Sequence, residues 1–381
     1  MSTTTRVEEC NGEVLYMALE LSAAKWKVGT TTSAGQKARE KTLRAGDLEG
    51  LKEEIERAKR RFGLSVRALV MSCYEAGRDG FWIHRYLESI GVSNVVVDPA
   101  SVDVNRRKRR AKTDRLDVMK LLSSLIRWCE GEQKVWSVVR VPEVGDEDAR
   151  HFHREREELK KERTQHINRM KSLLVLHGVR KEKIGPKFME ELESLRQWDG
   201  SELPSQVRRR LEWEYRRLEL VNEQLQELEK QRAEAVRRSK DPRIEKVRKL
   251  ERLRGVGEVG SWTTVMELFG WRKFDNRKQV GSMLGLTGTP SSSGEMNREQ
   301  GIDKAGSRRL RSLMIEMAWS WVRYQPHSEL TKWFNRRFGG GGKRMRRIGI
   351  VAVARRLAIA LWRYLEQDIV PAGAIIKATR G

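Results

Sequence analysis

The pattern of apolar residues changes near residue 143, and this change limits what each part of the chain can fold into. Before it, short apolar runs alternate with helical patterns. Four strands are predicted, over Val14–Leu19, Trp26–Thr32, Val66–Met71 and Asn94–Val97. Three helices are predicted, over Leu48–Arg61, Asp79–Ile90 and Asp114–Ile126. Alternating strands and helices predict a layered α/β domain. Beyond residue 143 strand signals stop, so the fold class is α/β plus all-α.

Residues 143–250 are dominated by Glu, Lys, Arg, Leu and Gln, with breaks at Gly185-Pro186 and Leu203-Pro204. A heptad stripe is formed by Leu211, Leu218, Val221, Leu225 and Leu228. Such a stripe needs a partner helix. The partner is either the Leu159–Leu174 helix of the same chain or another subunit, and the stripe alone does not favour one over the other. A plain helical spacer with solvated charges is the simpler alternative.

The remaining residues are predicted to be mostly helical, with glycine-rich interruptions. The turn Leu253–Gly260 resembles a helix-hairpin-helix contact with a phosphate, although many interhelical turns contain similar glycines. A small-residue loop spans Gly285–Gly294. Farther on, the Gly339–Gly342 hinge and the basic run Lys343–Arg347 precede an amphipathic helix over Ile348–Leu365. Three domains are therefore predicted, over residues 12–132, 143–250 and 251–381.

The charge balance favours a polyanionic partner. The 381 residues include 77 Lys and Arg against 53 Asp and Glu, which gives a net charge of +24 and a pI of about 10.2. Nucleic acid is favoured over a membrane surface, because no apolar run approaches the ~20 residues of a spanning helix. The absence of a signal peptide and of paired cysteines predicts a cytoplasmic, nucleoid-associated protein. The predicted nucleic-acid-binding residues are Arg106, Arg107, Lys108, Arg109, Arg110, Lys112, Arg298, Lys304, Arg308, Arg309, Lys343, Arg344, Arg346 and Arg347.

Four acidic residues stand out against this basic background. Glu20 ends one apolar run and Glu75 follows another, while Asp114 and Asp117 are three apart at the start of a predicted helix. That spacing places both aspartates on one helix face. Carboxylates at strand ends together with a helical pair are typical of a divalent-metal site for phosphodiester chemistry in a ribonuclease-H-like fold. Each of these residues alone would more simply be a solvated surface group.

The loop Gly285–Gly294 contains three consecutive serines, from Ser291 to Ser293, and cations follow it closely. Serine and glycine runs are mostly flexible linkers. A hydroxyl beside cations and a metal would instead attack phosphorus and form a covalent phosphoserine.

Two sets of motifs in this chain resemble those of the DEDD transposases of insertion-sequence family one-ten, also called bridge recombinases. The first set resembles the RuvC-like half of that family, and it comprises Leu19-Glu20-Leu21-Ser22, Ser72–Gly80, Asp98-Pro99 and Arg109–Asp117. The second set resembles its C-terminal serine transposase domain, and it comprises Arg254–Gly257, Phe274–Gln279, Gly285-Leu286-Thr287, Ser293-Gly294 and Gly301–Gly306. The similarity spans almost the whole chain, in the order of the family.

The resemblance implies a RuvC-like first domain, a helical middle and a C-terminal domain with a nucleophilic serine. Glu20, Glu75, Asp114 and Asp117 match the metal-binding tetrad, and Ser293 matches the nucleophile, with Ser291 and Ser292 as its neighbours. Glu20 departs from the aspartate of the family, and its extra methylene moves the carboxylate by about 1.5 Å.

The implied cofactor is Mg²⁺ or Mn²⁺. The implied partners are donor and target DNA, a structured guide (bridge) RNA and further copies of the chain, in a dimer or tetramer. Because recombining two duplexes needs at least two catalytic serines, the resemblance favours contacts between subunits at the heptad stripe. Two alternatives remain at this point: a RuvC-like junction nuclease that uses water, and a non-catalytic nucleic-acid-binding protein.

Overall fold

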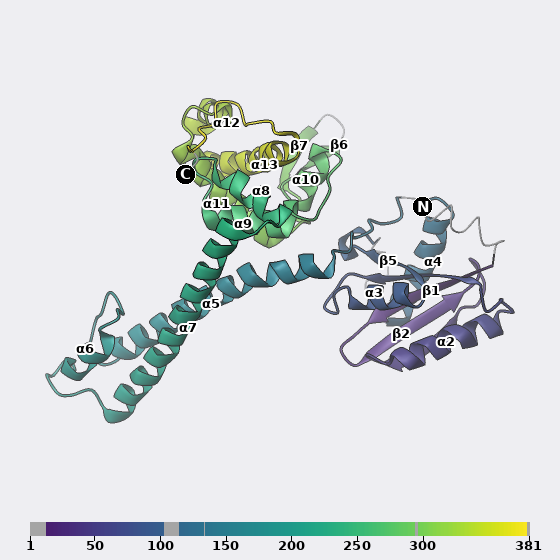
Figure 1. The fold of residues 1–381 in the computed structure, drawn as a ribbon, viewed down its shortest axis with the longest axis horizontal. Coiled ribbons are helices and arrows are strands. Elements are labelled where there is room, and N and C mark those ends of the chain that lie inside the picture. Colours follow the sequence, from purple (N-terminus) through teal and green to yellow (C-terminus); the bar gives the residue numbers. More distant parts are fainter. Residues whose placement is uncertain (1–12, 103–113, 133, 294–295, 379–381) are drawn as a thin grey trace. The chain divides into compact units, whose positions relative to one another are not determined.

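The computed structural model describes residues 13–102, 114–132, 134–293 and 296–378 (Figure 1). The chain divides into two compact units, Met1–Pro142 and Glu143–Gly381. None of the helices within these described ranges combines the length and the apolar character that crossing a membrane requires.

The first unit is built on a five-stranded sheet with the order β3-β2-β1-β4-β5. Strands β1, β2 and β3 form an antiparallel meander, and β4 and β5 run parallel to β1. The strands are β1 Val14–Leu21, β2 Lys25–Thr31, β3 Arg39–Arg44, β4 Leu69–Glu75 and β5 Ser93–Val97. The α-helices are α2 Leu48–Arg61, α3 Trp82–Ser89 and α4 Asp114–Cys129. The predicted α/β arrangement is therefore present.

Successive side chains of β1 point to opposite faces of the sheet, and each face has its own core. Val14, Tyr16 and Ala18 pack with buried side chains of α4 on one face. Leu15, Met17 and Leu19 pack with α2 and α3 on the other face. The sheet is thus covered on both sides (Figure 1), and every β1 residue up to Leu19 is buried.

Three sequence predictions for this unit need correction. Strand β3 was not predicted, because Arg39–Arg44 is polar and forms the edge of the sheet. Strand β4 begins at Leu69 rather than Val66, whose side chain is 76% exposed, and it ends at Glu75. Helix α3 begins at Trp82 rather than Asp79. The predicted helix Leu48–Arg61 is confirmed.

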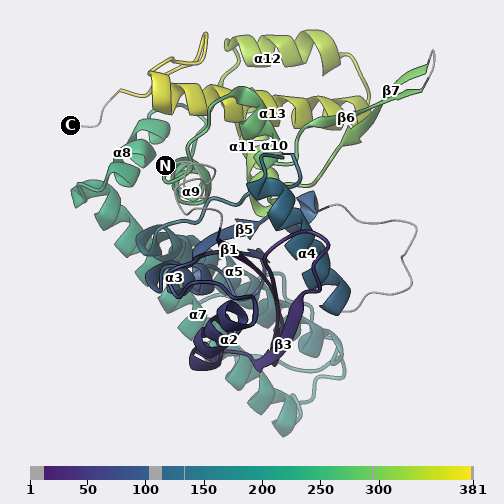
Figure 2. The same ribbon diagram turned by 90° about the vertical axis from the view of Figure 1, so that its right-hand side faces the viewer.

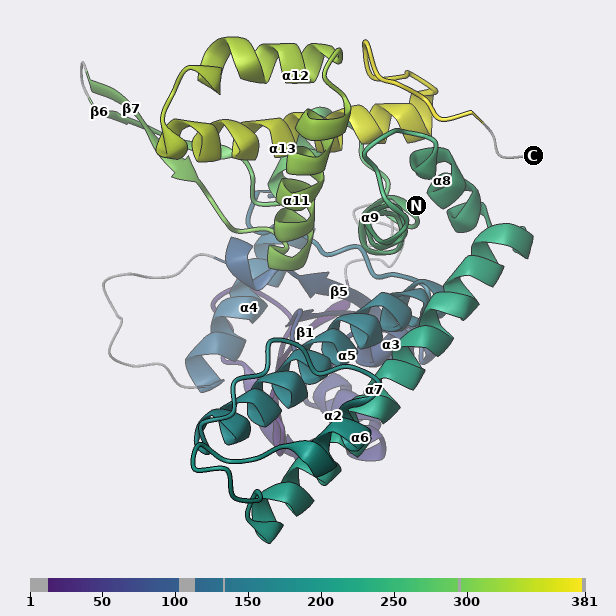
Figure 3. The same ribbon diagram turned by 90° about the vertical axis from the view of Figure 1, so that its left-hand side faces the viewer.

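The second unit begins with an antiparallel pair of long helices, α5 Val144–Val175 and α7 Ser205–Arg238, with the short helix α6 Phe188–Ser194 between them in sequence. The two long helices lie side by side (Figure 3). Leu211 and Leu218 pack with Met170 and Leu174 of α5, and Val221 and Leu225 of the heptad stripe pack with Leu159 of α5. The stripe is therefore buried within one chain, and our preference for a partner subunit at these leucines was wrong.

The rest of the second unit is a helical bundle around α13 Lys343–Gln367. The other α-helices are α8 Pro242–Glu251, α9 Glu258–Thr264, α10 Arg277–Met283, α11 Arg308–Tyr324 and α12 Glu329–Phe334, and two π-helical segments, Val265–Phe269 and Asn335–Gly339, follow α9 and α12. Val353, Leu357 and Leu361 of α13 are fully buried in its core. A hairpin of β6 Gly288–Ser293 and β7 Met296–Ile302 projects from this bundle (Figures 2 and 3).

Two predictions in this region were wrong. The segment Gly285–Gly294 was predicted to be a loop, but its residues Gly288–Ser293 form strand β6, whose backbone hydrogen bonds to β7 overcome the low strand preference of Gly, Pro and Ser. The helix predicted from Ile348 already begins at Lys343, so the basic run Lys343–Arg347 forms its first turns.

Candidate active site

Glu20 and Glu75 lie side by side at one end of the sheet. Strands β1 and β4 are parallel neighbours in a register that pairs Leu19 with Tyr74, and each glutamate follows directly. By the alternation of side chains, both glutamates point to the face that α4 covers. Because neighbouring strands are about 4.8 Å apart, the two side chains leave the sheet next to each other.

A pocket of about 260 Å³ opens at this end of the sheet. Its walls are the segments Glu20–Ala23 and Tyr74–Gly80, which leave β1 and β4. Gly80 adopts a φ of 66°, which favours glycine, and its carbonyl accepts a hydrogen bond of 3.0 Å from the hydroxyl of Tyr74. The local turn after β4 is thus anchored to the strand that carries Glu75.

Helix α4 presents its first turn to the same end of the sheet. Val118 meets Gly29 of β2, which pairs with Ala18 of β1. At the other end of the helix Cys129 packs in the same core as Tyr16. Burial raises the pKa of Tyr16 to about 12, and Cys129 and Glu130 contribute to this shift. The helix therefore runs antiparallel to β1, and its N-terminus lies toward Glu20.

The predicted aspartates occupy that first turn. Asp114 opens α4, and Asp117 is half-buried one turn later. The side chain of Asp114 lies outside the described residues, which leaves the predicted metal tetrad untested. Among the side chains that are described, no group of three or more His, Cys, Asp or Glu is close enough to hold a metal ion.

The carboxylates nevertheless suit a hard divalent cation. Mg²⁺ and Mn²⁺ prefer oxygen ligands, and here two glutamates share one strand end and one sheet face. Asp114 and Asp117 are further carboxylates in the first turn of the helix that covers the same face. In donor type, these residues therefore fit the implied metal.

Ser293 lies at the far end of the projecting hairpin of the second unit. It is the last residue of β6 and pairs with Met296, while Ser292 pairs with Asn297 and Ser291 with Arg298. The structure describes no side chains for residues 289–300. The predictions that Ser293 is the nucleophile and that Arg298 binds nucleic acid are therefore untested. The backbone alone places the serine run on a strand rather than in a linker.

The base of this hairpin is held by close backbone contact. Gly285 adopts a φ of 60°, and a Cβ there would lie 2.5 Å from a guanidinium nitrogen of Arg311 and 2.7 Å from the backbone nitrogen of Gly306. That Arg311 nitrogen donates to the carbonyls of Leu284, Lys304 and Gly306, at 3.1, 3.2 and 3.3 Å. Arg311 is therefore a structural clamp for the serine hairpin.

The predicted nucleic-acid-binding residues fall into three groups. The basic segment Arg106–Arg110 with Lys112 and the side chain of Arg298 lie outside the described residues. Exposed positions are occupied by Lys304, Arg308, Lys343, Arg344, Arg346 and Arg347. Arg309 differs, because its guanidinium pairs with Glu157 at 2.9 Å and with Glu267 at 3.2 Å.

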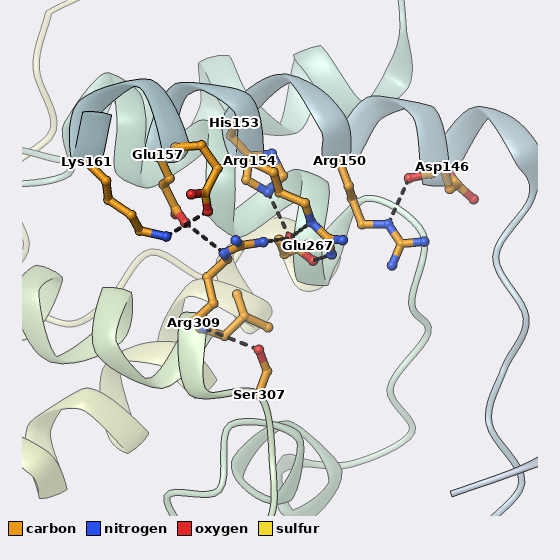
Figure 4. A network of polar contacts seen from close by, with 11 residues as sticks. Asp146, Arg150, His153, Arg154, Glu157, Lys161, Glu267, Ser307 and Arg309 are labelled. Atoms are coloured by element: carbon orange, nitrogen blue, oxygen red, sulfur yellow. Dashed lines mark hydrogen bonds and ion pairs between the residues drawn. The ribbon is translucent and has the colours of Figure 1, made fainter. Parts of the chain in front are cut away.

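Sequence reasoning missed the buried carboxylate of Glu267, which ties α5 to the bundle (Figure 4). It accepts hydrogen bonds from His153 at 2.9 Å and from Arg154 at 2.9 and 3.1 Å. Burial alone would raise the pKa of Glu267, but the hydrogen bonds from His153 and Arg154 outweigh it and hold the pKa well below its ordinary value. The only sequence signal is an acid inside the apolar run Val265–Phe269, and nothing in that run reveals its partners on α5.

Comparison with known proteins gives the class of the chain. Residues 247–331, which include the serine hairpin, match the family model described as "Transposase IS116/IS110/IS902 family". A Sinorhizobium fredii protein (strain NBRC 101917 / NGR234) named "Putative transposase y4rJ" is 37% identical over 377 residues, covering 95% of this chain and 94% of that protein. The class is thus transposase.

The chain belongs to the IS116/IS110/IS902 family of transposases, the enzymes that move insertion sequences in DNA. A second protein of the same Sinorhizobium fredii strain, y4qE, also carries a transposase name and is 29% identical over 269 residues, which is 68% of this chain and 60% of that protein. The "Transposase for insertion sequence element IS1533" of Leptospira borgpetersenii is 28% identical over 108 residues, or 28% of this chain and 30% of that protein. At the level of the family, the resemblance noted in the sequence is confirmed.

Proposed function

We propose that this transposase cuts and rejoins DNA through a covalent bond between Ser293 and a DNA phosphate. The observation that carries the proposal is the pairing of Glu20 and Glu75 at adjacent strand ends, on the sheet face where α4 begins with Asp114 and Asp117. This placement suits phosphoryl transfer, and the family match covers the hairpin on which Ser293 lies.

The proposed reaction is a balanced exchange. The Ser293 oxygen loses its proton and bonds to phosphorus, the bond from phosphorus to one sugar oxygen breaks, and that oxygen takes up a proton. A sugar hydroxyl of the exchanged strand then attacks the phosphoserine, which releases Ser293. No water is consumed, so the phosphodiester bonds are conserved in number.

Glu20, Glu75, Asp114 and Asp117 would hold Mg²⁺ or Mn²⁺. When bound, the cation neutralises negative charge on the phosphate and favours the ionised serine. The residues of the chain supply its oxygen ligands and fix them on the sheet end. The extra methylene of Glu20 shifts one ligand by about 1.5 Å without removing its charge.

A structured guide RNA and further copies of the chain complete the proposal. Base pairing of such an RNA with DNA would supply sequence choice, while the +24 charge holds the phosphate backbones. Recombining two duplexes needs at least two nucleophilic serines, which predicts a dimer or tetramer. Loss of DNA joining after ribonuclease treatment of the purified protein supports the RNA, and a monomeric mass by light scattering with nucleic acid bound contradicts the oligomer.

The nucleophile is tested by trapping the adduct. Wild-type protein, Ser293→Ala and Ser292→Ala are incubated with end-labelled DNA and separated on a denaturing gel. We expect the adduct to be absent only in Ser293→Ala. Cleavage without any adduct indicates a nuclease that uses water, and neither cleavage nor an adduct under any metal indicates a non-catalytic binding protein.

The metal is tested with the same gel. Glu75→Gln and Asp117→Asn keep the side-chain size but remove the charge, and we expect each to lower the cleavage rate by at least 100-fold. Glu53→Gln on the exposed face of α2 is the control and should cleave normally. Full activity in EDTA, or in Glu75→Gln, contradicts the proposed metal site.

A further inference from the structure

The second unit contains a groove that the proposed reaction does not use. It has a volume of about 1640 Å³ and follows one side of α13. Its other walls are α12, the segment Ile369–Ala372 and the base of the serine hairpin at Gly288, Gly301 and Ile302. Figure 3 shows these elements around α13, with the hairpin at the end where that helix begins.

The groove is strongly and unequally charged. Eight of its described lining residues are Arg or Lys, and a single one is acidic. That acid, Glu329, already pairs with Lys332 at 3.0 Å. Within the described part of the chain, none of the eight cations forms an ion pair, although such pairs are frequent elsewhere in this unit. The groove therefore presents positive charge that the chain itself does not neutralise.

The beginning of α13 adds to this imbalance. Lys343, Arg344 and Arg347 line the groove from the first turns of the helix, and no acidic residue is present in its first turn. A helix N-terminus carries partial positive charge, so cations there repel it and anions are attracted. An anionic ligand reduces the repulsion between these cations and the helix dipole, and also the repulsion among the cations themselves.

The floor and rim of the groove are apolar as well as cationic. Met345, Ile348, Ile369 and Val370 line it, and each side chain is 41–52% exposed. The guanidinium carbon of Arg356 lies 3.8 Å from the ring centre of Trp333. Burial lowers the pKa of Arg356, and the neighbouring Arg337 and Arg355 lower it further.

We infer that this groove binds an unpaired stretch of nucleic acid, with its phosphates on the cations and its bases on the apolar floor. A duplex offers mainly phosphates to a protein surface, whereas a single strand also offers base faces that pack on apolar and aromatic side chains. The 16 helical steps from Arg347 to Arg363 span roughly 24 Å, which is enough for several nucleotides. The inference rests on the proposed function, since it takes DNA recombination to expose such strands or a guide RNA to provide them.

The test measures binding by fluorescence anisotropy of a labelled 15-nucleotide oligo-dT and of a duplex of the same length. The full-length chain carries Arg344→Gln, Arg347→Gln and Arg363→Gln together. We expect the affinity for oligo-dT to fall at least 10-fold. Because each phosphate contact on a single strand contributes about −0.7 to the slope of log K against log salt, that slope should become shallower by about 2.

The matched control removes the same charge from exposed cations that are already paired. It carries Arg57→Gln, Lys161→Gln and Arg238→Gln, whose partners are Glu53, Glu158 and Glu234. We expect less than a 2-fold change in affinity. A loss equal to that of the groove variant means that only net charge matters, which overturns the inference.

A second variant, Ile348→Ser, tests the floor without changing charge. We expect oligo-dT binding to weaken 3-fold or more while duplex binding stays within 1.5-fold. Equal losses for both ligands mean that the groove holds a duplex, and displacement of oligo-dT by polyglutamate at equal charge means that it holds an acidic protein. Either result overturns the inference.

The two proposals fail separately. The Ser293 adduct on duplex DNA is measured in the same groove variants. Unchanged oligo-dT binding with an intact adduct removes the groove proposal alone. Loss of oligo-dT binding in the groove variant, with no adduct in any protein, removes the proposed reaction alone.

Discussion

The arm formed by α5 and α7 and the groove along α13 contain similar cations, but they differ in how the charge is neutralised. On the arm, Arg156 pairs with Glu229 at 2.5 Å, and Arg217 pairs with the buried Glu214 at 2.8 Å. Along α13, no lining cation has an acidic partner among the described residues. Arg156 thus ties α5 to α7 and Arg217 neutralises a buried acid, whereas the groove cations are left free for a ligand.

This difference shows that a count of cations is a poor guide to a binding surface. Arg308 and Arg309 are neighbours in the sequence and were both predicted to bind nucleic acid. The structure leaves Arg308 exposed and commits Arg309 to Glu157 and Glu267. The partner of a cation, rather than its position in a basic run, decides between a structural and a binding role.

The largest effect is expected where cations share a buried acid, and Glu267→Gln tests this. This change leaves His153, Arg154 and Arg309 around an uncharged amide, and breaking a buried ion pair costs about 3 kcal/mol. We expect that loss in the free energy of unfolding, measured by urea denaturation. The control Glu245→Gln removes an exposed partner of Arg248 and should cost less than about 0.5 kcal/mol.

The same carboxylate predicts a pH dependence. The pKa of Glu267 is lower in the folded chain than its ordinary value of 4.5. Its contribution to stability is therefore fully present above pH 4.5 and is lost as the pH falls toward the folded pKa. Below pH 4.5 the wild type should lose stability more steeply than Glu267→Gln, and parallel curves would contradict the assignment.

The next prediction concerns the apolar seam of the arm. Leu218 is 3% exposed against α5, whereas Leu220, on the same helix, is 54% exposed. Leu218→Ala should cost about 3 kcal/mol, because a buried cavity is created, and Leu220→Ala less than about 0.5 kcal/mol. Since the seam closes within one chain, light scattering should give both variants the mass of the wild type. A lower mass for Leu218→Ala would mean that the heptad stripe holds two subunits together.

The parts of the fold that the sequence predicted are those with a strong apolar pattern. The apolar run Val14–Leu19 is buried on both faces of the sheet and the 3.6-residue pattern of Leu48–Arg61 buries one helix face, and both elements are present, although β1 continues to Leu21. Strand β3 and the serine hairpin were missed because their residues are polar, Gly or Ser, and their partners lie on other strands. Backbone pairing across the chain leaves no periodic signal in such segments.

The functional residues also divide into those that the sequence could reveal and those that it could not. Glu20 and Glu75 could be selected because each terminates an apolar strand, and the register then brings them together. Glu267 could not, since its three partners, His153, Arg154 and Arg309, are 42–114 residues away in sequence. The groove was anticipated only at Lys343–Arg347, because Arg355, Arg356 and Arg363 are separated along α13 and gather only through its helical turn.

A smaller effect separates Arg308 from Arg309. Arg309→Gln removes two ion pairs with partly buried acids and should lower the free energy of unfolding by about 1 kcal/mol. Arg308→Gln should leave stability within about 0.3 kcal/mol. The effect on nucleic-acid affinity at low salt should be reversed: Arg308→Gln should bind more weakly than Arg309→Gln. Equal effects of both variants on both measurements would remove the distinction between paired and unpaired cations.

The smallest expected effect has the opposite sign. Arg344 is exposed in the first turn of α13, where the helix dipole disfavours a cation and favours an anion. Arg344→Glu should therefore raise the free energy of unfolding by about 0.5 kcal/mol, while oligo-dT affinity falls several-fold. Arg238→Glu, near the C-terminus of α7, is the mirror control: the dipole there favours the cation, so this change should lower stability slightly and leave binding unchanged. If Arg344→Glu destabilises the chain, then the cations at the start of α13 are neutralised within the fold, and the contrast between the arm and the groove does not hold.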